Sequence, residues 1–463
     1  MQKIIKLGGL ILLCAPISLA QAQPEPLTTT EQAQKIHLEP LQLIQQALHV
    51  HPVIRAAQND IEAARLEQQV IQRQRYFTPS AQAQFREDYR SAKVAIEQPL
   101  WTAGRLSSAQ DKAAFDYKIA VEGDQAKRYD IASKVLETWG LLLDAHERIQ
   151  VATQTLTELE AFAGMMARRV DTGVSARVEL DLVESRILQS RVSYENAEQM
   201  IHLGLARLAQ LLNDDRLMHS NFTLPNLLTL SEQLKNSYQP ELMLQNSALG
   251  RSHPLVKQAQ DQAKSVLKQA QVVRASRYPQ VMIGYEYEHQ HHYHQPLANQ
   301  DQKQIYLSVQ YTPSAGWSSL LSERSLRAKA AGLEDTMAAT HQQVLDQIHQ
   351  QLYSFLSAQG RMKTLATAMN SARLVQQSYQ RQFIAGRKSW LEVMNATREI
   401  EQTAYDLSST RSALIISYYQ LQLLTGALEP VLNSDSILPV AFDGDDKNRL
   451  TPVTSSLSNT VQP

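Results

Sequence analysis

The chain has 463 residues, of which 45 are Lys or Arg and 46 are Asp or Glu, giving a formal net charge of −1. This near balance gives no sign of the basic surface that nucleic-acid binding requires. Glycine (16 residues) and proline (17 residues) are scarce, which favours helix, and the single cysteine excludes a disulfide within the chain.

The N-terminal segment is typical of a secretory signal peptide. Two lysines precede a short apolar run over residues 7–19, and Ala20-Gln21-Ala22 fits a small-x-small cleavage site. We therefore expect residues 1–22 to be a signal peptide and residues 23–40 to be a polar N-terminal lead. After the signal there is no run of about 18 apolar residues, so no transmembrane helix is predicted.

A first structural unit is predicted over residues 41–213. A helix begins near Leu41, steps at Pro52 and ends before Pro79, because proline interrupts the helical hydrogen-bond ladder. Residues from about 80 to 100 then alternate between apolar and polar side chains, which predicts two short strands.

Two long helices complete this unit. The first runs from Gly104 to about Val170 and, at ~1.5 Å per residue, spans roughly 100 Å. A turn at Gly173 separates it from a second helix over residues 175–212. A less regular link follows over residues 214–250.

A second unit over residues 251–426 repeats the same order of elements. A helix starting at Pro254 precedes two alternating segments within residues 280–311, and two long helices are predicted on either side of Gly386. The tail, residues 427–463, is rich in Ser, Thr, Asn, Asp and Pro and is predicted to be disordered.

Short motifs recur between the two units, about 200 residues apart. His51-Pro52 recurs as His253-Pro254, and Arg75-Tyr76 recurs as Arg277-Tyr278. The last helix of each unit has apolar residues seven apart, at Leu180, Ile187, Tyr194, Ile201 and Leu208 and at Val393, Ile400, Leu407, Leu414 and Leu421. Small residues stand between these positions, among them Ser190, Ala197 and Gly204 and then Ala396, Thr403, Thr410 and Ser417. This pattern predicts antiparallel coiled coils with close helix contacts.

The predicted strands limit how the chain functions. Each unit contributes two strands, so one chain offers four, whereas a closed membrane barrel needs eight or more. Open sheet edges cannot lie in lipid, because their backbone groups stay unpaired. Either the sheet is soluble or several chains pool their strands, and three chains would supply twelve. The alternative is a soluble periplasmic coiled-coil adaptor or scaffold, which does not account for the strands.

The motifs, in this order and in duplicate, resemble the TolC-type family of outer-membrane channels over about residues 41–426. The segments that carry the resemblance are Gln46–Leu48 with His51-Pro52, Gln98–Arg105, Gly386–Val393 and Leu421–Gly426.

The resemblance implies a fold that is mainly α with a small β part. Long antiparallel coiled-coil helices would form an α-barrel tunnel in the periplasm, and four strands per chain would join a trimeric, 12-stranded transmembrane β-barrel. The implied protein is a homotrimeric conduit in the outer membrane and not an enzyme. Its implied partners are outer-membrane lipid, a periplasmic adaptor protein and an inner-membrane pump of the ABC or RND type. Neither a cofactor nor a nucleic-acid partner is expected.

The resemblance also bears on the cargo, since family members export proteins, drugs or metal ions. The segment Tyr311–Ser319 departs from the strand-to-helix motif of the first unit. It is similar to the form found in members that serve type I secretion of large adhesins. We therefore rank protein secretion ahead of multidrug or metal efflux.

Four histidines, His289, His291, His292 and His294, lie between the third and fourth predicted strands. Imidazole clusters bind zinc, nickel or copper. An exposed loop lacks the surrounding groups that orient metal ligands, and the resemblance assigns this loop to the extracellular side. A polar surface loop is therefore the preferred interpretation, and no functional metal site is predicted.

The two predicted tip turns carry the preferred candidate site, a periplasmic gate. In the resemblance, Glu392 matches one acidic ring position, whereas Asn395 replaces the acidic residue of a second ring. Lys388 and Glu179 match a basic and an acidic residue that link neighbouring coils, and Asp181 lies beside them. The alternative is that these are ordinary solvated helix charges. The sequence has no supported Ser/His/Asp arrangement, phosphate loop or catalytic carboxylate pair.

Overall fold

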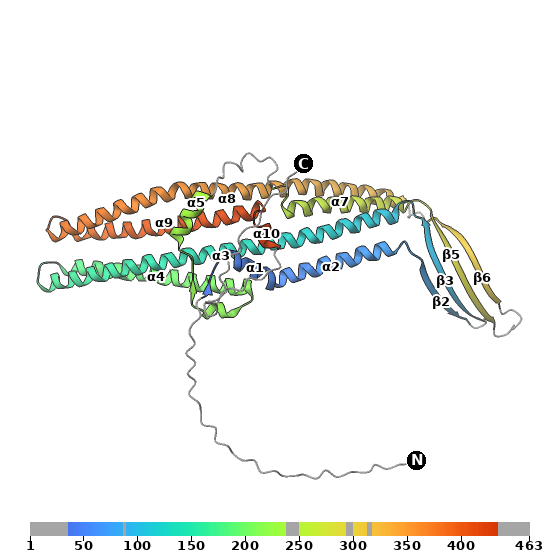
Figure 1. The fold of residues 1–463 in the computed structure, drawn as a ribbon, viewed down its shortest axis with the longest axis horizontal. Helices are drawn as coiled ribbons and strands as arrows, with labels where there is room; N and C mark the ends of the chain where they lie inside the picture. Colours follow the sequence, from blue (N-terminus) through green and yellow to red (C-terminus); the bar gives the residue numbers. More distant parts are fainter. Residues whose placement is uncertain (1–35, 87–88, 238–249, 293–299, 313–316, 434–463) are drawn as a thin grey trace, which may run out of the picture.

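The computed structural model describes residues 36–86, 89–237, 250–292, 300–312 and 317–433 (Figure 1). Long helices lie side by side along the molecule, and a four-stranded sheet stands at one end. The expected signal peptide lies outside the described residues. Within the described ranges, none of the helices is both long and apolar enough to cross a membrane.

The first unit has the predicted order of elements. These are α1 (Pro40–Val50), α2 (Pro52–Arg73), β2 (Thr78–Phe85), β3 (Tyr89–Trp101), α3 (Arg105–Asp171) and α4 (Arg177–Leu212). The step predicted at Pro52 divides two helices, because His51 has an extended backbone (φ −68°, ψ 127°), as residues before proline prefer. Pro79 was expected to end the helix but lies within β2, which tolerates proline because it is an edge strand.

The second unit repeats this order, as predicted. Its elements are α7 (Pro254–Ala275), β5 (Gln280–His292), β6 (Gln300–Gln310), α8 (Ser318–Ile384) and α9 (Trp390–Leu424). The recurring His-Pro motif starts a helix in both units. Nδ1 of His51 accepts a hydrogen bond from the Val53 N–H at 3.2 Å, and Nδ1 of His253 accepts one from the Leu255 N–H at 3.3 Å. Each histidine therefore caps a helix whose first residue is proline.

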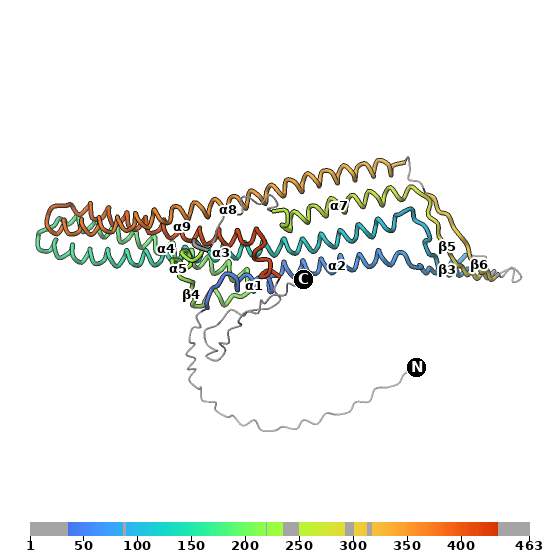
Figure 2. The backbone as a smooth tube through the Cα atoms, turned by 45° about the horizontal axis from the view of Figure 1, so that its top comes forward, coloured from blue at the N-terminus to red at the C-terminus, as the bar shows by residue number. Residues whose placement is uncertain are grey.

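The order of the helices matches the order of the strands. Next to the sheet, neighbouring helices follow the order α2, α3, α7, α8, and the strands follow the order β2-β3-β5-β6. Farther from the sheet, α4 packs on α3, α9 packs on α8, and α3 contacts α9. Two helical hairpins, α3–α4 and α8–α9, therefore lie side by side and end together at the pole opposite the sheet (Figures 1 and 2).

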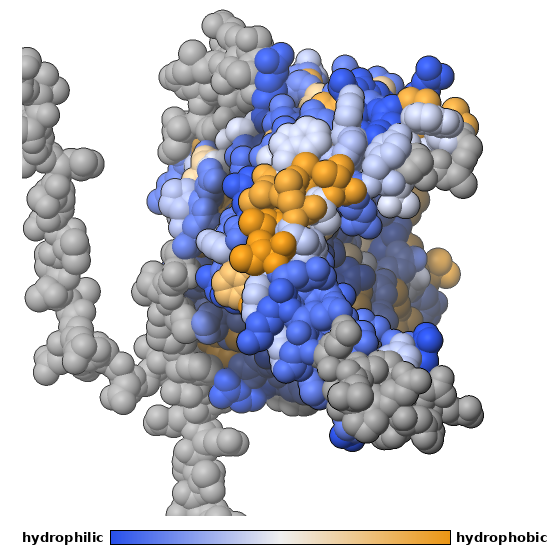
Figure 3. Space-filling model, turned by 90° about the vertical axis from the view of Figure 1, so that its right-hand side faces the viewer, coloured by the Kyte–Doolittle hydropathy of each residue, from blue (hydrophilic) through white to orange (hydrophobic). Residues whose placement is uncertain are grey.

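The antiparallel sheet separates apolar from polar side chains. One face carries, in register across neighbouring strands, Ala81, Val94 and Tyr287, then Pro79, Ile96, Tyr285 and Ile305, then Ile283 and Leu307. The other face carries Lys93, Glu97, Glu286, Glu288 and Gln304. Ile305 is 76% exposed and Leu307 is 64% exposed, so none of the described segments covers this part of the apolar face. Figure 3 views this end of the molecule and shows the apolar patch.

A tyrosine crosses the polar face of the sheet. The Tyr306 hydroxyl on β6 donates a 2.6 Å hydrogen bond to Glu97 on β3, so it reaches across the strand between them. Its ring lies over Gly284 of β5, where an added Cβ would come within 2.4 Å of the ring. Lys93 also pairs across strands with Glu286 at 2.7 Å. The polar face is therefore linked side chain to side chain across three strands.

Small residues allow the long helices to approach closely, as their spacing predicts. A Cβ at Gly204 of α4 would fall 2.6 Å from Leu142 of α3. A Cβ at Gly140 of α3 would fall 2.2 Å from Ile416 of α9. The first contact lies within a hairpin and the second joins the two hairpins.

Short elements pack against the middle of the long helices. They are β1 (Ile36–His37), η1 (Asp215–His219), β4 (Phe222–Thr223), α5 (Leu227–Ser237) and α10 (Glu429–Leu432), with β1 parallel to β4. The end of the segment expected to be a polar lead is therefore structured. Ile36 and Leu38 are buried, and the Leu38 carbonyl accepts a 2.8 Å hydrogen bond from the buried Trp139 indole.

The structure also differs from the predicted disorder at the start of the tail. Leu432 of α10 is buried, and the Arg128 guanidinium donates a 2.9 Å hydrogen bond to the Leu432 carbonyl. Polar composition concealed this contact, because a few apolar residues suffice to hold one helical turn in place. Residues 434–463 lie outside the described residues.

Candidate functional site: the tips of the two hairpins

The two hairpin turns lie at the same end of the molecule (Figures 1 and 2). Gly173 and Gly386 have φ values of 72° and 70°, in the left-handed region, where glycine is favoured because it has no side chain. The turns therefore close in the same way, as the duplicated sequence predicts. They bring α4 and α9 back along α3 and α8.

Lys388 and Glu392 form an ion pair within the second tip. The Lys388 ammonium donates to a Glu392 carboxylate oxygen at 2.5 Å, and the Ser389 backbone N–H donates to the other oxygen at 3.0 Å. Glu392 thus completes a capping box at the start of α9. The hydrogen bond to Lys388 lowers the pKa of Glu392, and the same bond raises the pKa of Lys388.

The other candidate gate residues occupy separate positions. Glu179 lies half-buried in the first turn of α4, and within the described residues its expected link to Lys388 is not formed. Asp181 pairs instead with Arg177 of the same helix at 3.0 Å. Asn395 is exposed and lines a groove on the α8–α9 hairpin together with Glu392. The structure brings Lys388 and Glu392 of the second tip together, but it does not bring Lys388 to Glu179 of the first tip.

Sequence reasoning missed an apolar cluster just inside the tips. We call it the tip cluster; its buried members are Leu159, Phe162, Met166, Leu180, Val183, Phe383, Trp390, Val393 and Met394. Trp390 is 1% exposed and packs edge-on against Phe162, with ring centroids 5.4 Å apart. The Arg169 guanidinium of α3 lies 4.8 Å from the ring centroid of Phe383 in α8. The signal for this cluster in the sequence is Trp390 beside the second tip turn, within the segment Gly386–Val393 that carries the family resemblance.

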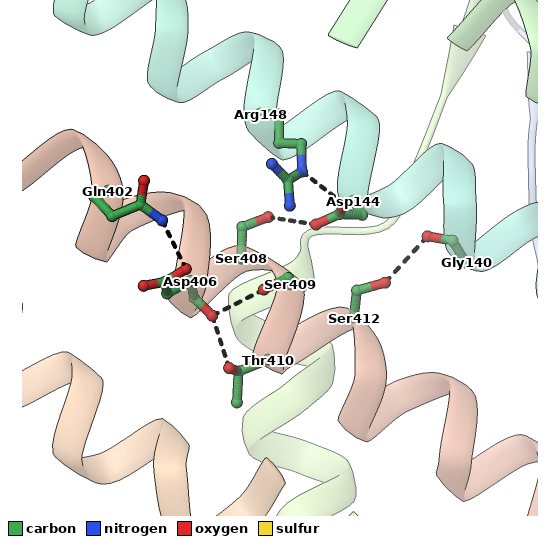
Figure 4. Close-up of polar contacts among 9 residues, drawn as sticks. All are labelled: Gly140, Asp144, Arg148, Gln402, Asp406, Ser408, Ser409, Thr410 and Ser412. Carbon is green, nitrogen blue, oxygen red and sulfur yellow. Dashed lines mark hydrogen bonds and ion pairs between the residues drawn. The ribbon is translucent and has the colours of Figure 1, made fainter. Parts of the chain in front are cut away.

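Between the tip cluster and the sheet, the two hairpins meet along a polar seam between α3 and α9 (Figure 4). Ser412 donates a 3.0 Å hydrogen bond to the Gly140 carbonyl. Ser408 donates to Asp144 at 3.4 Å, and Asp144 also pairs with Arg148 at 2.7 Å. The seam therefore consists of small residues and matched polar groups.

The candidate histidines were expected in a loop, but those that the structure describes lie in a strand. His289, His291 and His292 belong to strand β5, and His294 lies outside the described residues. His289 contacts Asp301 of β6 at 2.5 Å. In the described part of the chain, His, Cys, Asp and Glu side chains form no group of three or more placed to hold a metal ion.

A family comparison identifies this architecture. The family described as "Outer membrane efflux protein" matches residues 43–214 and 244–427. These two ranges correspond to the two structural units and cover most of the chain. No curated protein matches the chain by sequence.

Solved structures share the fold. A membrane protein from Pseudomonas aeruginosa is 17% identical, with a TM-score of 0.73, covering 89% of this chain and 98% of that one. The outer membrane protein VceC from Vibrio cholerae is 16% identical, with a TM-score of 0.72, covering 84% and 96%. The outer membrane channel CmeC from Campylobacter jejuni is 11% identical, with a TM-score of 0.70, covering 89% and 94%.

The fold, the duplicated hairpins and the family match agree with one another, and they decide against a soluble coiled-coil adaptor. The chain is a channel protein of the outer membrane and not an enzyme, and it belongs to the outer membrane efflux protein family.

Proposed function

We propose that three copies of this chain assemble into one conduit across the outer membrane and the periplasm. The observation that carries the proposal is the four-stranded sheet of the described residues, in which β2 and β6 are the edge strands and each pairs with one neighbouring strand. Unpaired backbone groups are costly in lipid. Pairing β6 of one copy with β2 of the next removes both edges, and three copies give a barrel of twelve strands.

The side-chain pattern of the sheet supports the same proposal. The apolar face of Ile96, Ile283, Ile305 and Leu307 suits lipid, whereas the linked polar face suits an aqueous interior. The helical hairpins then surround a tunnel that continues from the barrel. We propose that an adaptor protein and an inner-membrane pump of the ABC or RND type deliver substrate to its tip.

The tip charges support a role in closing this tunnel. Lys388 is proposed to link to Glu179 of a neighbouring copy, since among the described residues of one copy its ion pair is with Glu392 and not with Glu179. The family name denotes efflux and does not specify the cargo. The preference for protein secretion stays a prediction from residues 311–319, of which 313–316 lie outside the described residues.

Cysteines on the two edge strands test the assembly. Positions on the polar face of β2 (Ser80, Gln82, Gln84) would be combined with positions on the polar face of β6 (Gln304, Ser308, Gln310) in a Cys14→Ala background. Oxidation in isolated outer membranes should yield linked species of two and three chains. Ser91→Cys with Gln290→Cys is the matched control, because these residues face each other within one chain and should give no ladder. If every edge combination stays monomeric while the control pair oxidises, the assembly proposal is wrong.

A further inference from the structure

The apolar face of the sheet changes in character along the strands. Near the helices, the residues that lie in register on this face are uncharged, among them the pairs Ile283–Leu307 and Ile96–Tyr285. Within the described strands, the charged and imidazole side chains of this face all lie in the three registers farthest from the helices. We call them the outer rim; its members are Arg90, His289, His291, Asp301 and Lys303.

Side-chain contacts show that the outer rim lies on the apolar face and not on the polar face. The Lys303 ammonium of β6 lies 5.6 Å from the ring centroid of Tyr287, which is in register with Val94 on the apolar face. His289 of β5 contacts Asp301 of β6 at 2.5 Å. Asp301 is the single carboxylate at the outward positions of the described strands, and this histidine engages it. Lys303 is exposed, so its cation faces the surroundings of the sheet.

The outer rim lies at one edge of a band as tall as the lipid-facing band of a membrane barrel. At ~3.4 Å per residue and a strand tilt of about 40°, the ten-residue step from Val281 to His291 rises roughly 26 Å, and such bands are ~25 Å tall. Trp101 is in register with Val281, and Arg90 is in register with His291. Trp101 is 50% exposed, as is usual for a tryptophan at a membrane interface. Arg90 therefore stands at the opposite interface.

The rim belongs to the outer leaflet. The helices α2, α3, α7 and α8 join the strands at the end opposite the rim (Figure 1), and these helices form the periplasmic part of this outer-membrane protein. Lys303 stands lower on the sheet than Arg90, but a lysine at this depth reaches the headgroup level with its long side chain. Both cations are thus available to the headgroups of lipids in the outer leaflet.

The charges of the rim favour a phosphate-bearing partner. Guanidinium and ammonium groups form strong, charge-assisted hydrogen bonds with phosphate oxygens, and basic side chains at a membrane surface attract anionic headgroups. Arg90 and Lys303 lie two strand spacings apart across the sheet and four positions apart along it, so their Cα atoms are roughly 17 Å apart. Two side chains of this length can flank one large headgroup from two sides.

We propose that the outer rim of each copy binds the phosphate-bearing headgroup of a lipid in the outer leaflet, and that Arg90 and Lys303 contact its phosphate oxygens. This inference rests on the proposed function, because the barrel is what turns this face of the sheet toward lipid. Asp301 opposes binding by its negative charge, and its contact with His289 limits that effect. A trimer then has three equivalent lipid sites around the barrel.

The first experiment removes the two cations. Purified trimers in a mild detergent would be titrated with lipid A that carries two phosphates, and native mass spectrometry would count the lipids bound to each trimer. Each cation at an anionic lipid surface changes binding about fivefold, so Arg90→Gln with Lys303→Gln should weaken it roughly twenty-five-fold. Lipid A from which both phosphates have been removed should bind the wild type and this variant equally weakly. Wild-type affinity in the double variant would overturn the proposal.

A matched control separates the rim from the net charge of the protein. Lys93 lies on β3, like Arg90, but on the polar face, where it pairs with Glu286 at 2.7 Å. Lys93→Gln should therefore leave lipid A binding within about twofold of the wild type, whereas Lys303→Gln alone should weaken it about fivefold. Equal losses in these two single variants would mean that the binding depends on net charge and not on the rim.

A gain of binding provides a test that misfolding cannot mimic. Asp301→Asn removes the single carboxylate of the rim and should tighten the binding of lipid A several-fold, because the opposing charge is lost while Arg90 and Lys303 remain. Unchanged or weaker binding in trimeric Asp301→Asn would contradict the assigned role of charge.

Inorganic pyrophosphate distinguishes a lipid site from a site for free anions. Added at the same concentration as lipid A, it should not displace the lipid, because the acyl chains contribute most of the burial at a lipid-facing surface. Displacement would show a site for free phosphate groups and would overturn the lipid assignment. Failure of the proposed function has a different result, since a wild-type particle of one chain would reject the barrel together with this inference. A trimer whose lipid binding ignores Arg90 and Lys303 would reject this inference alone.

Discussion

The Nζ atom of Lys388 lies 2.5 Å from the Oε1 atom of Glu392, so these two charged gate candidates of the second tip form an ion pair within one copy. The family resemblance suggested that Lys388 would face an acidic residue on a neighbouring coil. Its ammonium pairs instead with the carboxylate of Glu392, four residues later, in the first turn of α9. A charge substitution at either residue therefore also removes this ion pair within the second tip.

Lys388→Glu should open the entrance. The new carboxylate would lie beside Glu392, and on the proposed assembly it would also face Glu179 of the next copy, so attraction becomes repulsion at both places. An exposed pair contributes little by itself, but the substitution is repeated in three copies, so the three effects add and shift the equilibrium between the closed and open entrance toward the open state. Larger single-trimer conductance and greater cell sensitivity to bulky antibiotics are the measurements. Arg387→Glu, one residue earlier in the turn, serves as the control.

Asn395→Asp should change ion selectivity more than Glu392→Gln does. Asn395 is exposed, and a carboxylate there would add a ring of unneutralised charge in the proposed trimer. The charge of Glu392 is already compensated by Lys388, so its loss changes the electrostatic potential at the entrance less. Reversal potentials in a salt gradient should show cation selectivity rising in Asn395→Asp and falling slightly in Glu392→Gln. Equal and unchanged selectivity in both variants would mean that the two residues are ordinary surface groups.

Gly204→Ala should destabilise the fold. Its Cβ would meet the side chain of Leu142 at 2.6 Å, and Leu142 is fully buried and cannot move aside. Overpacking of this kind costs about 1–3 kcal/mol. Gly360→Ala in α8 is the matched control, because a Cβ there meets no atom within 4 Å and should stabilise the helix by about 0.5–1 kcal/mol. The unfolding midpoints should therefore move in opposite directions, and a stabilised Gly204→Ala would contradict the close contact.

His253 should make the fold less stable in acid. Burial lowers its pKa from 6.5 to about 4, so the unfolded chain takes up a proton at a higher pH than the folded one does. The stability that neutral His253 contributes is complete above pH 6.5 and falls by about 3 kcal/mol as the pH drops toward 4. His253→Asn, which retains a cap for α7, should flatten the pH profile of the unfolding midpoint. His51→Asn should flatten it less, because His51 is only partly buried. A profile unaltered by His253→Asn would be inconsistent with this assignment.

The helices and strands were predictable because their signals are local. Heptad spacing and the absence of proline indicated α4 and α9, and alternation indicated four strands whose apolar and polar faces the structure confirms. The ends of the helices and strands differ from the predicted ones where contacts with a neighbouring segment set them. Pro79 lies within β2, at the edge of the described sheet, and Leu38 is held in place because its carbonyl accepts a hydrogen bond from the Trp139 indole.

The site was only partly predictable, because its contacts are distant in sequence. The tip cluster brings Phe162 against Trp390 across two hairpins, and no periodicity within one helix indicates that pairing. The charge of Lys388 was visible in the sequence, but its partner was set by the capping geometry at Ser389. A contact between hairpins requires knowledge of how the two units dock, which the sequence pattern alone does not contain.

The number of chains in the native particle decides whether three open sheets close into one barrel. Protein extracted from outer membranes with a mild detergent should be measured by native mass spectrometry, without heating. We expect a particle of three chains that dissociates to single chains only when boiled. A particle containing one chain, or recovery of the protein in the soluble fraction, would contradict the proposal that three open sheets close into one barrel.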